Sequence, residues 1–132
     1  MTTLKTLKKQ AQIAMQKAYA PYSNFSVGAA LIDENNNVHL GCNVENSAYP
    51  EGVCAEAGAI SNMILSGGKS IKKILIVSSG DLMVTPCGGC RQKIKEFSDE
   101  NTQILIDHNN EITQFSMNDL LPHSFDKSHL PR

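Results

Sequence analysis

Three cysteines and one glutamate, in two separate segments, constrain this chain more than any other feature. Cys54-Ala-Glu56 forms the first segment and Pro86-Cys-Gly-Gly-Cys90 the second. Thiolates suit Zn²⁺, and a site with three protein ligands leaves the fourth coordination position open. A carboxylate two residues from one ligand can move protons at that position. Any fold that forms such a site must bring the two segments together.

Other interpretations of these residues remain open at this level. The pair Cys87-x-x-Cys90 alone is compatible with a redox pair or with half of a structural zinc site. A structural four-cysteine site would need Cys42, which lies in a predicted strand and is expected to be a buried or half-buried thiol. Glu56 also fits a first-turn position that the helix dipole favours. The histidines are not at ligand spacing and are expected to be surface or structural residues: His39, His108, His123 and His129.

Composition indicates one globular domain over residues 1–132, with 41% apolar and 19% charged residues. The net charge of −1, without a basic stretch interleaved with aromatics, argues against a nucleic-acid partner. No apolar run approaches the roughly 20 residues that span a bilayer, so we expect no membrane partner. The first residues lack the apolar core of a signal peptide. We therefore expect a cytoplasmic protein, whose four cysteines are thiols or metal ligands.

Hydrophobic periodicity predicts an α/β fold, a three-layer α/β/α sandwich around a mixed sheet of about five strands. The predicted helices cover 3–19, 54–65 and 88–97, and the predicted strands 27–33, 38–44, 73–79, 102–107 and 112–116. A capping box at 116–119 precedes a short helix at 120–121. The strand–helix–strand run from 73 to 107 predicts two parallel strands with a right-handed crossover.

This layout places both cysteine segments at helix N-termini. Helix N-termini carry partial positive charge and lower thiol pKa values. Three thiolates on Zn²⁺ leave one excess negative charge, which such termini can partly offset. We therefore expect Cys54, Cys87 and Cys90 to be held deprotonated and ready for metal.

With these residues in place, the chain resembles the cytidine deaminases of the small, homotetrameric, zinc-dependent class. A cysteine, then x-Glu, then a distant Pro-Cys-x-x-Cys is typical of zinc nucleobase deaminases. The matching segments span nearly the whole chain: 21–25, 27–30, 41–46, 54–56, 86–92 and 120–122. The resemblance implies hydrolytic deamination of cytidine and deoxycytidine to uridine and deoxyuridine in pyrimidine salvage, with release of ammonia. It also implies a homotetramer whose active sites are shared between subunits.

The resemblance assigns roles to individual residues. It implies that Cys54, Cys87 and Cys90 bind one Zn²⁺ per subunit and that Glu56 shuttles protons. The implied substrate contacts are Phe25 on the pyrimidine ring, Asn43 and Glu45 on the ribose 3′-hydroxyl, the Ala55 N–H on the base carbonyl, the Thr85 carbonyl on the exocyclic amine, and Tyr49 and Phe125 across subunit boundaries. Phe25 also fits ordinary core packing. Asn43 and Glu45 also fit a polar strand end, although positions i and i+2 of a strand share one face.

Two positions depart from the family pattern. Many members carry Arg after the catalytic Glu, where it offsets the thiolate charge, and here that residue is Ala57. We hypothesise that Arg91 and the two helix dipoles take over this compensation. Ser26 stands where Pro is common, and we expect it to loosen the Phe25 loop.

Two other functions remain as alternatives. The first is a zinc deaminase for a different nucleoside, a modified base or a nucleoside antibiotic. The second is a non-catalytic zinc-binding module, which would have no use for Glu56 or a ribose clamp.

Overall fold

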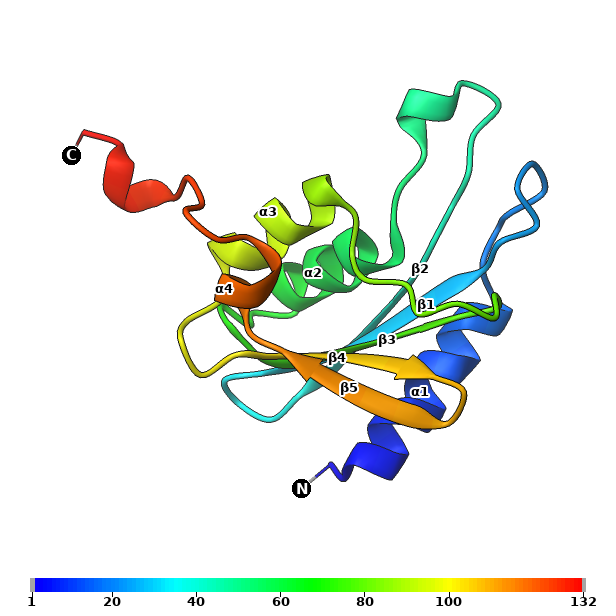
Figure 1. Cartoon of the computed structure of the whole chain (residues 1–132), viewed down its shortest axis with the longest axis horizontal. Helices are drawn as coiled ribbons and strands as arrows, with labels where there is room; N and C mark the ends of the chain where they lie inside the picture. The colour runs from blue at the N-terminus through cyan, green and yellow to red at the C-terminus, as the bar shows by residue number, and fades with distance from the viewer. Residues whose placement is uncertain (1, 132) are drawn as a thin grey trace.

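A computed structural model of the chain describes residues 2–131, and Met1 and Arg132, the two ends of the predicted domain, lie outside them. The helices are α1 (Leu4–Gln16), α2 (Ala55–Leu65), α3 (Gly88–Glu96) and α4 (Met117–Leu120), with 3₁₀ turns η1 (Tyr49–Glu51) and η2 (Lys127–His129). The strands are β1 (Val27–Asp33), β2 (Val38–Cys42), β3 (Ile71–Ser78), β4 (Gln103–His108) and β5 (Glu111–Phe115). Figure 1 shows the η1 loop and the C-terminal tail projecting from the layered body.

The five strands form one mixed sheet in the order β2-β1-β3-β4-β5. β1 pairs antiparallel with both β2 and β3, and β4 pairs antiparallel with β5. β3 and β4 pair in parallel, with Ile74 opposite Ile104. The parallel pair confirms the predicted strand–helix–strand unit, because parallel neighbours need a crossover such as α3.

Helices cover both faces of the sheet and give three layers, as predicted (Figure 1). Alternate strand residues point to opposite faces. Leu75 of β3 packs with Leu7 of α1 in one core cluster, whereas Ile74 and Ile76 pack with residues of α2, α3 and α4 in the other. The continuous apolar run of β3 is therefore buried on both faces, as a parallel-sheet strand requires.

A glycine lets the backbone of β2 lie directly on the backbone of α2. A Cβ on Gly41 would come within 2.2 Å of the Ala55 carbonyl oxygen and 2.3 Å of the Ala59 nitrogen. These contacts are with backbone atoms, which cannot rotate away. Gly41 therefore fixes how closely the N-terminal turn of α2 approaches the sheet.

The first helix ends earlier than the predicted residue 19. Its C-cap is Lys17, and Tyr19 instead pairs with the segment after β2. The Tyr19 N–H donates to the Asn43 carbonyl at 3.0 Å, and the Glu45 N–H donates to the Tyr19 carbonyl at 2.8 Å. The prediction was wrong here because helical periodicity does not register a backbone segment that pairs with a distant one.

The other helices and strands lie within two residues of the predicted bounds, except at the start of the last helix. β2 ends at Cys42 rather than at residue 44, and Val44 instead pairs with Val53 at the base of the η1 loop. The last helix begins at Met117, directly after its N-cap Ser116, rather than at residue 120, so that Asp119 of the capping box lies in its first turn. Cys42 is half-buried, as expected.

His39 is a structural residue inside the β1–β2 hairpin. Its Nε2 lies 2.8 Å from Oδ2 of the buried Asp33. The other Asp33 oxygen accepts hydrogen bonds from the Asn35 and Asn37 N–H groups of the turn. Separately, none of the helices within residues 2–131 is long and apolar enough to cross a membrane.

Candidate active site

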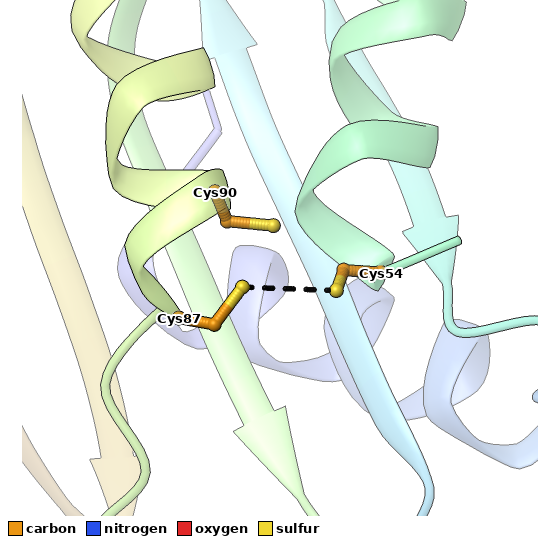
Figure 2. A group of neighbouring side chains, drawn as sticks. All are labelled: Cys54, Cys87 and Cys90. Atoms are coloured by element: carbon orange, nitrogen blue, oxygen red, sulfur yellow. Dashed lines mark hydrogen bonds between the residues drawn. The ribbon is translucent and has the colours of Figure 1, made fainter. Parts of the chain in front are cut away.

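Two helix N-termini bring the three cysteines together, as Figure 2 shows. Cys54 is the N-cap of α2 and Cys87 the N-cap of α3, and neither side chain caps its own helix. Cys90 lies in the first turn of α3 and is only 1% exposed. The three sulfur atoms therefore point into the space between the two helices.

The sulfur geometry fits a tetrahedral zinc site. The three sulfur atoms lie within 4.8 Å of one another, and Cys54 Sγ is 3.9 Å from Cys87 Sγ. Zn–S bonds of about 2.3 Å at tetrahedral angles place two sulfur ligands about 3.8 Å apart. The donor set and its spacing thus suit Zn²⁺, and three cysteine ligands leave one position for a water molecule.

The thiols differ in acidity, and this corrects the expectation that all three are held deprotonated. Burial raises the pKa of Cys54 and of Cys90, and the negative charges of Glu56 and of the neighbouring thiolates raise the pKa of Cys90 further. The dipole of the nearby Cys90 backbone N–H lowers the pKa of Cys87. Burial and mutual repulsion therefore outweigh the helix dipoles at two of the three thiols. A divalent cation relieves that repulsion.

Glu56 lies beside the metal ligands and is 5% exposed. Burial raises the pKa of its carboxyl group, while its own backbone N–H and the positive charge of Lys93 act in the opposite direction. A raised carboxyl pKa brings the group closer to the range in which it can both take and give a proton near neutral pH. A buried carboxylate next to an open metal position is a candidate proton carrier.

A cavity of about 240 Å³ opens in front of these groups. It brings together seven of the predicted site residues: Phe25, Asn43, Cys54, Ala55, Glu56, Thr85 and Cys87. Sequence reasoning missed three apolar residues that complete the lining: Val27, Ile76 and Val84. The strand pattern identifies Val27 and Ile76 only as sheet residues, so it carries no signal that they reach the cavity.

Asn43 and Glu45 hold the Phe25 loop at two points. Asn43 Nδ2 donates to the Phe25 carbonyl and Asn43 Oδ1 accepts from the Val27 N–H, both at 2.8 Å. Glu45 accepts from the N–H groups of Tyr22, at 2.9 Å, and Ser23, at 3.1 Å, and from the Ser23 hydroxyl. The Ser23 hydroxyl bond, partly opposed by desolvation, lowers the pKa of Glu45. Both side chains are therefore ordered by local bonds.

Three of the residues predicted to contact the substrate, Glu45, Tyr49 and Phe125, do not line the cavity of Glu56. Glu45 and Tyr49 line a neighbouring cavity of about 330 Å³ with Tyr22 and Ser23. Tyr49 is 75% exposed on the η1 loop. Phe125 lies on the tail, where its ring stacks on His129 and its carbonyl accepts from Gln92 Nε2 at 2.9 Å. One chain alone thus leaves these two aromatic rings outside the site.

The guanidinium group of Arg91 forms three hydrogen bonds to oxygen atoms. Its Nε donates to the Pro86 carbonyl, its Nη1 to the Leu120 carbonyl and its Nη2 to Thr85 Oγ1, each at 2.7 Å. These bonds fix the segment that leads into Cys87. A second cation is near: Lys93 Nζ lies 3.6 Å from where a Cβ on Gly89 would stand, against the first turn of α3.

Comparison with known proteins identifies the family. Residues 1–106 match the family described as "Cytidine and deoxycytidylate deaminase zinc-binding region". The chain belongs to this family. The matched span includes the cluster of Cys54, Cys87 and Cys90, which confirms zinc as the expected cofactor.

Individual relatives agree with this placement. A cytidine deaminase of Mycoplasma genitalium is 39% identical over 127 residues, which cover 95% of this chain and 97% of that protein. A cytidine deaminase of Mycobacterium tuberculosis is 36% identical over 126 residues, covering 96% and 92%. The crystal structure of cytidine deaminase from Burkholderia pseudomallei aligns with a TM-score of 0.87 at 36% identity, over 94% of this chain and 100% of that one. The expected deaminase family and α/β fold are confirmed.

Proposed function

We propose that the protein catalyses the zinc-dependent hydrolytic deamination of cytidine and deoxycytidine to uridine and deoxyuridine, with release of ammonia. The observation that carries the proposal is the cluster of three cysteine sulfurs beside a cavity that two of these cysteines, Cys54 and Cys87, line together with the buried Glu56, Phe25 and Asn43. Bound Zn²⁺ supplies the activation of a water molecule as the nucleophile.

Glu56 moves the protons in this proposal. Its carboxylate takes a proton from the water and delivers it to N3 of the pyrimidine, which makes C4 electrophilic. The oxygen of that water bonds to C4, which becomes tetrahedral. Glu56 takes the remaining proton of this oxygen and gives it to the amine, and ammonia leaves as the C4–N bond breaks and the C4 carbonyl forms. Its burial and raised pKa support both steps, because one group must accept and donate in a single turnover.

The remaining groups of the cavity bind and orient the base. The Ala55 N–H is in the first turn of α2, where N–H groups lack helical partners, so it can donate to the base carbonyl. In this proposal the Thr85 carbonyl accepts from the exocyclic amine, and the hydrogen bond from Arg91 to Thr85 Oγ1 supports this role by restraining the residue. Phe25 offers a ring face for the pyrimidine. Asn43 and Glu45 retain hydrogen-bonding capacity for the sugar. Asn43 Oδ1, Asn43 Nδ2 and Glu45 Oε2 each form one of the bonds described above, whereas such an oxygen can accept two hydrogen bonds and such an amide group can donate two.

One assay separates this proposal from its alternatives. Purified protein is incubated with cytidine, deoxycytidine or adenosine, with and without a chelator, and the ultraviolet absorbance is followed. Loss of the cytidine and deoxycytidine absorbance that stops with the chelator supports the proposal. A response to adenosine alone indicates another deaminase. Absence of any response favours a zinc-binding module.

We also propose a homotetramer of single-domain subunits with shared active sites. Large apolar side chains are exposed at Tyr49, Leu65 and Leu82, the last two at 85% and 80%. A mainly apolar groove of about 580 Å³ runs along the β2 edge between α1 and α2. The η1 loop and the tail project outward with Tyr49 and Phe125, where a second copy can receive them (Figure 1).

Light scattering gives the mass, and subunit mixing tests the sharing of sites. Glu56→Gln and Phe125→Ala proteins are unfolded and refolded together. If Phe125 serves a neighbouring subunit, mixed oligomers contain sites with both Glu56 and Phe125 and recover activity above that of either variant. A monomeric mass, or no recovery, rejects this arrangement. Cytoplasmic location is proposed from the free thiols of all four cysteines and is tested by cell fractionation.

A further inference from the structure

We infer that Ser79 and Gly80, which directly follow β3, are positioning residues for the Phe25 ring. The inference rests on the proposed function, because it concerns the ring that faces the pyrimidine. Neither residue lines the cavity of Glu56. They act on the base only through Phe25.

The first contact is a reciprocal bridge between Ser26 and Ser79. The Ser79 N–H donates to the Ser26 carbonyl at 2.9 Å, which continues the pairing of β1 with β3 beyond Val27 and Ser78. The Ser26 N–H donates to the Ser79 hydroxyl at 3.0 Å. The second bond depends on the Ser79 side chain. It ties down the backbone immediately after Phe25.

This bridge changes the expectation for Ser26. Proline at that position has no N–H, so it could not form the bond to Ser79. Serine there lacks the rigid proline ring, but its N–H is held by the hydroxyl of Ser79. Serine at position 26 therefore does not leave the Phe25 loop without a restraint. The hydrogen bond to Ser79 restrains the backbone here, whereas a proline would restrain it through its ring.

The second contact is made by the ring itself. A Cβ on Gly80 would lie 2.8 Å from Cε1 of Phe25 and 3.6 Å from Cδ1. The ring edge therefore rests against the bare Cα of Gly80. The backbone of Gly80 is outside the left-handed region, so alanine would be opposed only by the Phe25 ring.

Phe25 is thus held from two sides. On one side, Asn43 bonds its carbonyl and the Ser23 hydroxyl accepts from its N–H at 3.0 Å. On the other side stand Ser79 and Gly80. Since the half-buried ring lines the cavity with Glu56, a shift of a few tenths of an ångström changes the space left for the base.

Four single variants of the wild-type protein and one double variant test the inference. Gly80→Ala displaces the ring, and Ser79→Ala removes the bond to Ser26. Ser79→Thr keeps the hydroxyl. Ser78→Ala is the matched control, because no hydrogen bond of the Ser78 hydroxyl occurs within residues 2–131. Gly80→Ala is also made in a Phe25→Leu background, in which there is no aromatic ring to displace.

The variants are compared by steady-state kinetics and by fluorine NMR, and the NMR measurement does not require enzymatic activity. We expect Gly80→Ala to raise KM for cytidine about 5- to 10-fold with kcat changed less than about 2-fold. Ser79→Ala should raise KM about 3-fold, and Ser79→Thr should restore it. Fluorophenylalanine labels the four phenylalanines, so fluorine NMR gives four signals, with that of Phe25 assigned by Phe25→Leu. The Phe25 signal alone should move in Gly80→Ala and in Ser79→Ala, and it should stay in place in Ser78→Ala.

Each outcome is decisive. Movement of the Phe25 signal, with a KM effect of Gly80→Ala that disappears in the Phe25→Leu background, supports the inference. An unmoved Phe25 signal, or a KM effect that persists in that background, overturns it. If the wild-type protein does not deaminate cytidine but the signal moves, the proposed function fails and the positioning of Phe25 stands.

Discussion

The guanidinium Nη2 of Arg91 donates a 2.7 Å hydrogen bond to Thr85 Oγ1, so Arg91 holds the residue two positions before the ligand Cys87. Its other two bonds go to the carbonyls of Pro86 and Leu120. Arg91 therefore joins the cysteine loop to the end of α4, in addition to any effect of its charge on the thiolates.

Replacement of Arg91 by Ala should weaken zinc retention. The variant loses a positive charge near a site with one excess negative charge and frees the loop before Cys87. Competition with a chelator measures the zinc bound per subunit, and the pH–rate profile is recorded alongside. Arg91→Lys keeps the charge but not the planar set of three bonds, so it separates the two contributions. Unchanged zinc content and an unchanged profile would reject charge compensation by Arg91.

Replacement of Lys93 by Gln should shift the acid limb of kcat/KM to higher pH. The positive charge of Lys93 lowers the pKa of Glu56, against the larger effect of burial. Its removal raises that pKa, and Glu56 must be ionised to take a proton from water. Lys93→Arg keeps the charge and serves as the control. An acid limb that stays in place shows that Lys93 does not act on Glu56.

Replacement of Glu56 by Gln should leave zinc and ligand binding intact and slow turnover by about 10²- to 10⁴-fold. The amide occupies nearly the same volume in the buried position but cannot carry the proton. Metal analysis and kcat are measured on the same preparation. Turnover near that of the wild type would remove Glu56 from the proton-transfer role.

Removal of zinc should make Cys87 the most reactive of the three ligand thiols. Its pKa is lowered by the Cys90 N–H, and its side chain is exposed, whereas burial raises the pKa of Cys54 and of Cys90. Alkylation at neutral pH after chelation, followed by mass spectrometry, gives the order of labelling. Zinc-loaded protein is the control and should be protected. Faster labelling of Cys90 would contradict the acidities described above.

Replacement of Asp33 by Asn should destabilise the protein by about 1–3 kcal/mol at neutral pH, because three donors lose a carboxylate partner. Burial alone would raise the pKa of Asp33, but the hydrogen bonds from His39, Asn37 and Asn35 leave it lowered. The wild-type contribution is therefore present above the unfolded pKa of about 3.9 and lost as the pH falls through the folded value. Denaturant unfolding between pH 7 and pH 3 measures the slope, with the exposed Asp81→Asn as control. Equal slopes for the wild type and Asp33→Asn would contradict the account.

Much of the fold followed from the sequence because apolar periodicity and turn residues act locally. The bounds of β1 and the start of α3 were predicted at the observed residues, and the parallel pairing of β3 with β4 followed from the crossover rule. The predictions that failed for α1 and β2 concern ends that are set by pairing with a segment distant in the sequence. Helix α1 stops short of Tyr19 because Tyr19 pairs with the chain around Val44.

In the candidate site, too, some features could be predicted from the sequence and others depend on contacts between distant segments. Motif spacing predicted that Cys54, Cys87 and Cys90 form a cluster that could hold a metal ion, because a ligand set is encoded by residue type, and the structure brings the three sulfur atoms together. The contacts of Asn43 and Glu45 with the Phe25 loop were not predictable, since they depend on how two segments distant in sequence meet. The same holds for Gly80, whose sequence signal is that of any loop glycine. The pKa values of the three thiols also could not be predicted from the sequence, because burial and repulsion between neighbouring negative charges depend on how the side chains pack.

The three sulfurs belong to two different helices, and Cys54 and Cys87 are 33 residues apart along the chain. A metal ion held between them is therefore a cross-link that closes a long loop of the polypeptide, as a disulfide would, but reversibly. By mass action, an ion that binds only the folded chain adds about 4 kcal/mol of stability when its free concentration is about 1,000 times its Kd. The melting temperature of this protein should accordingly rise with free zinc, so that the ion needed for chemistry also clamps α2 to α3.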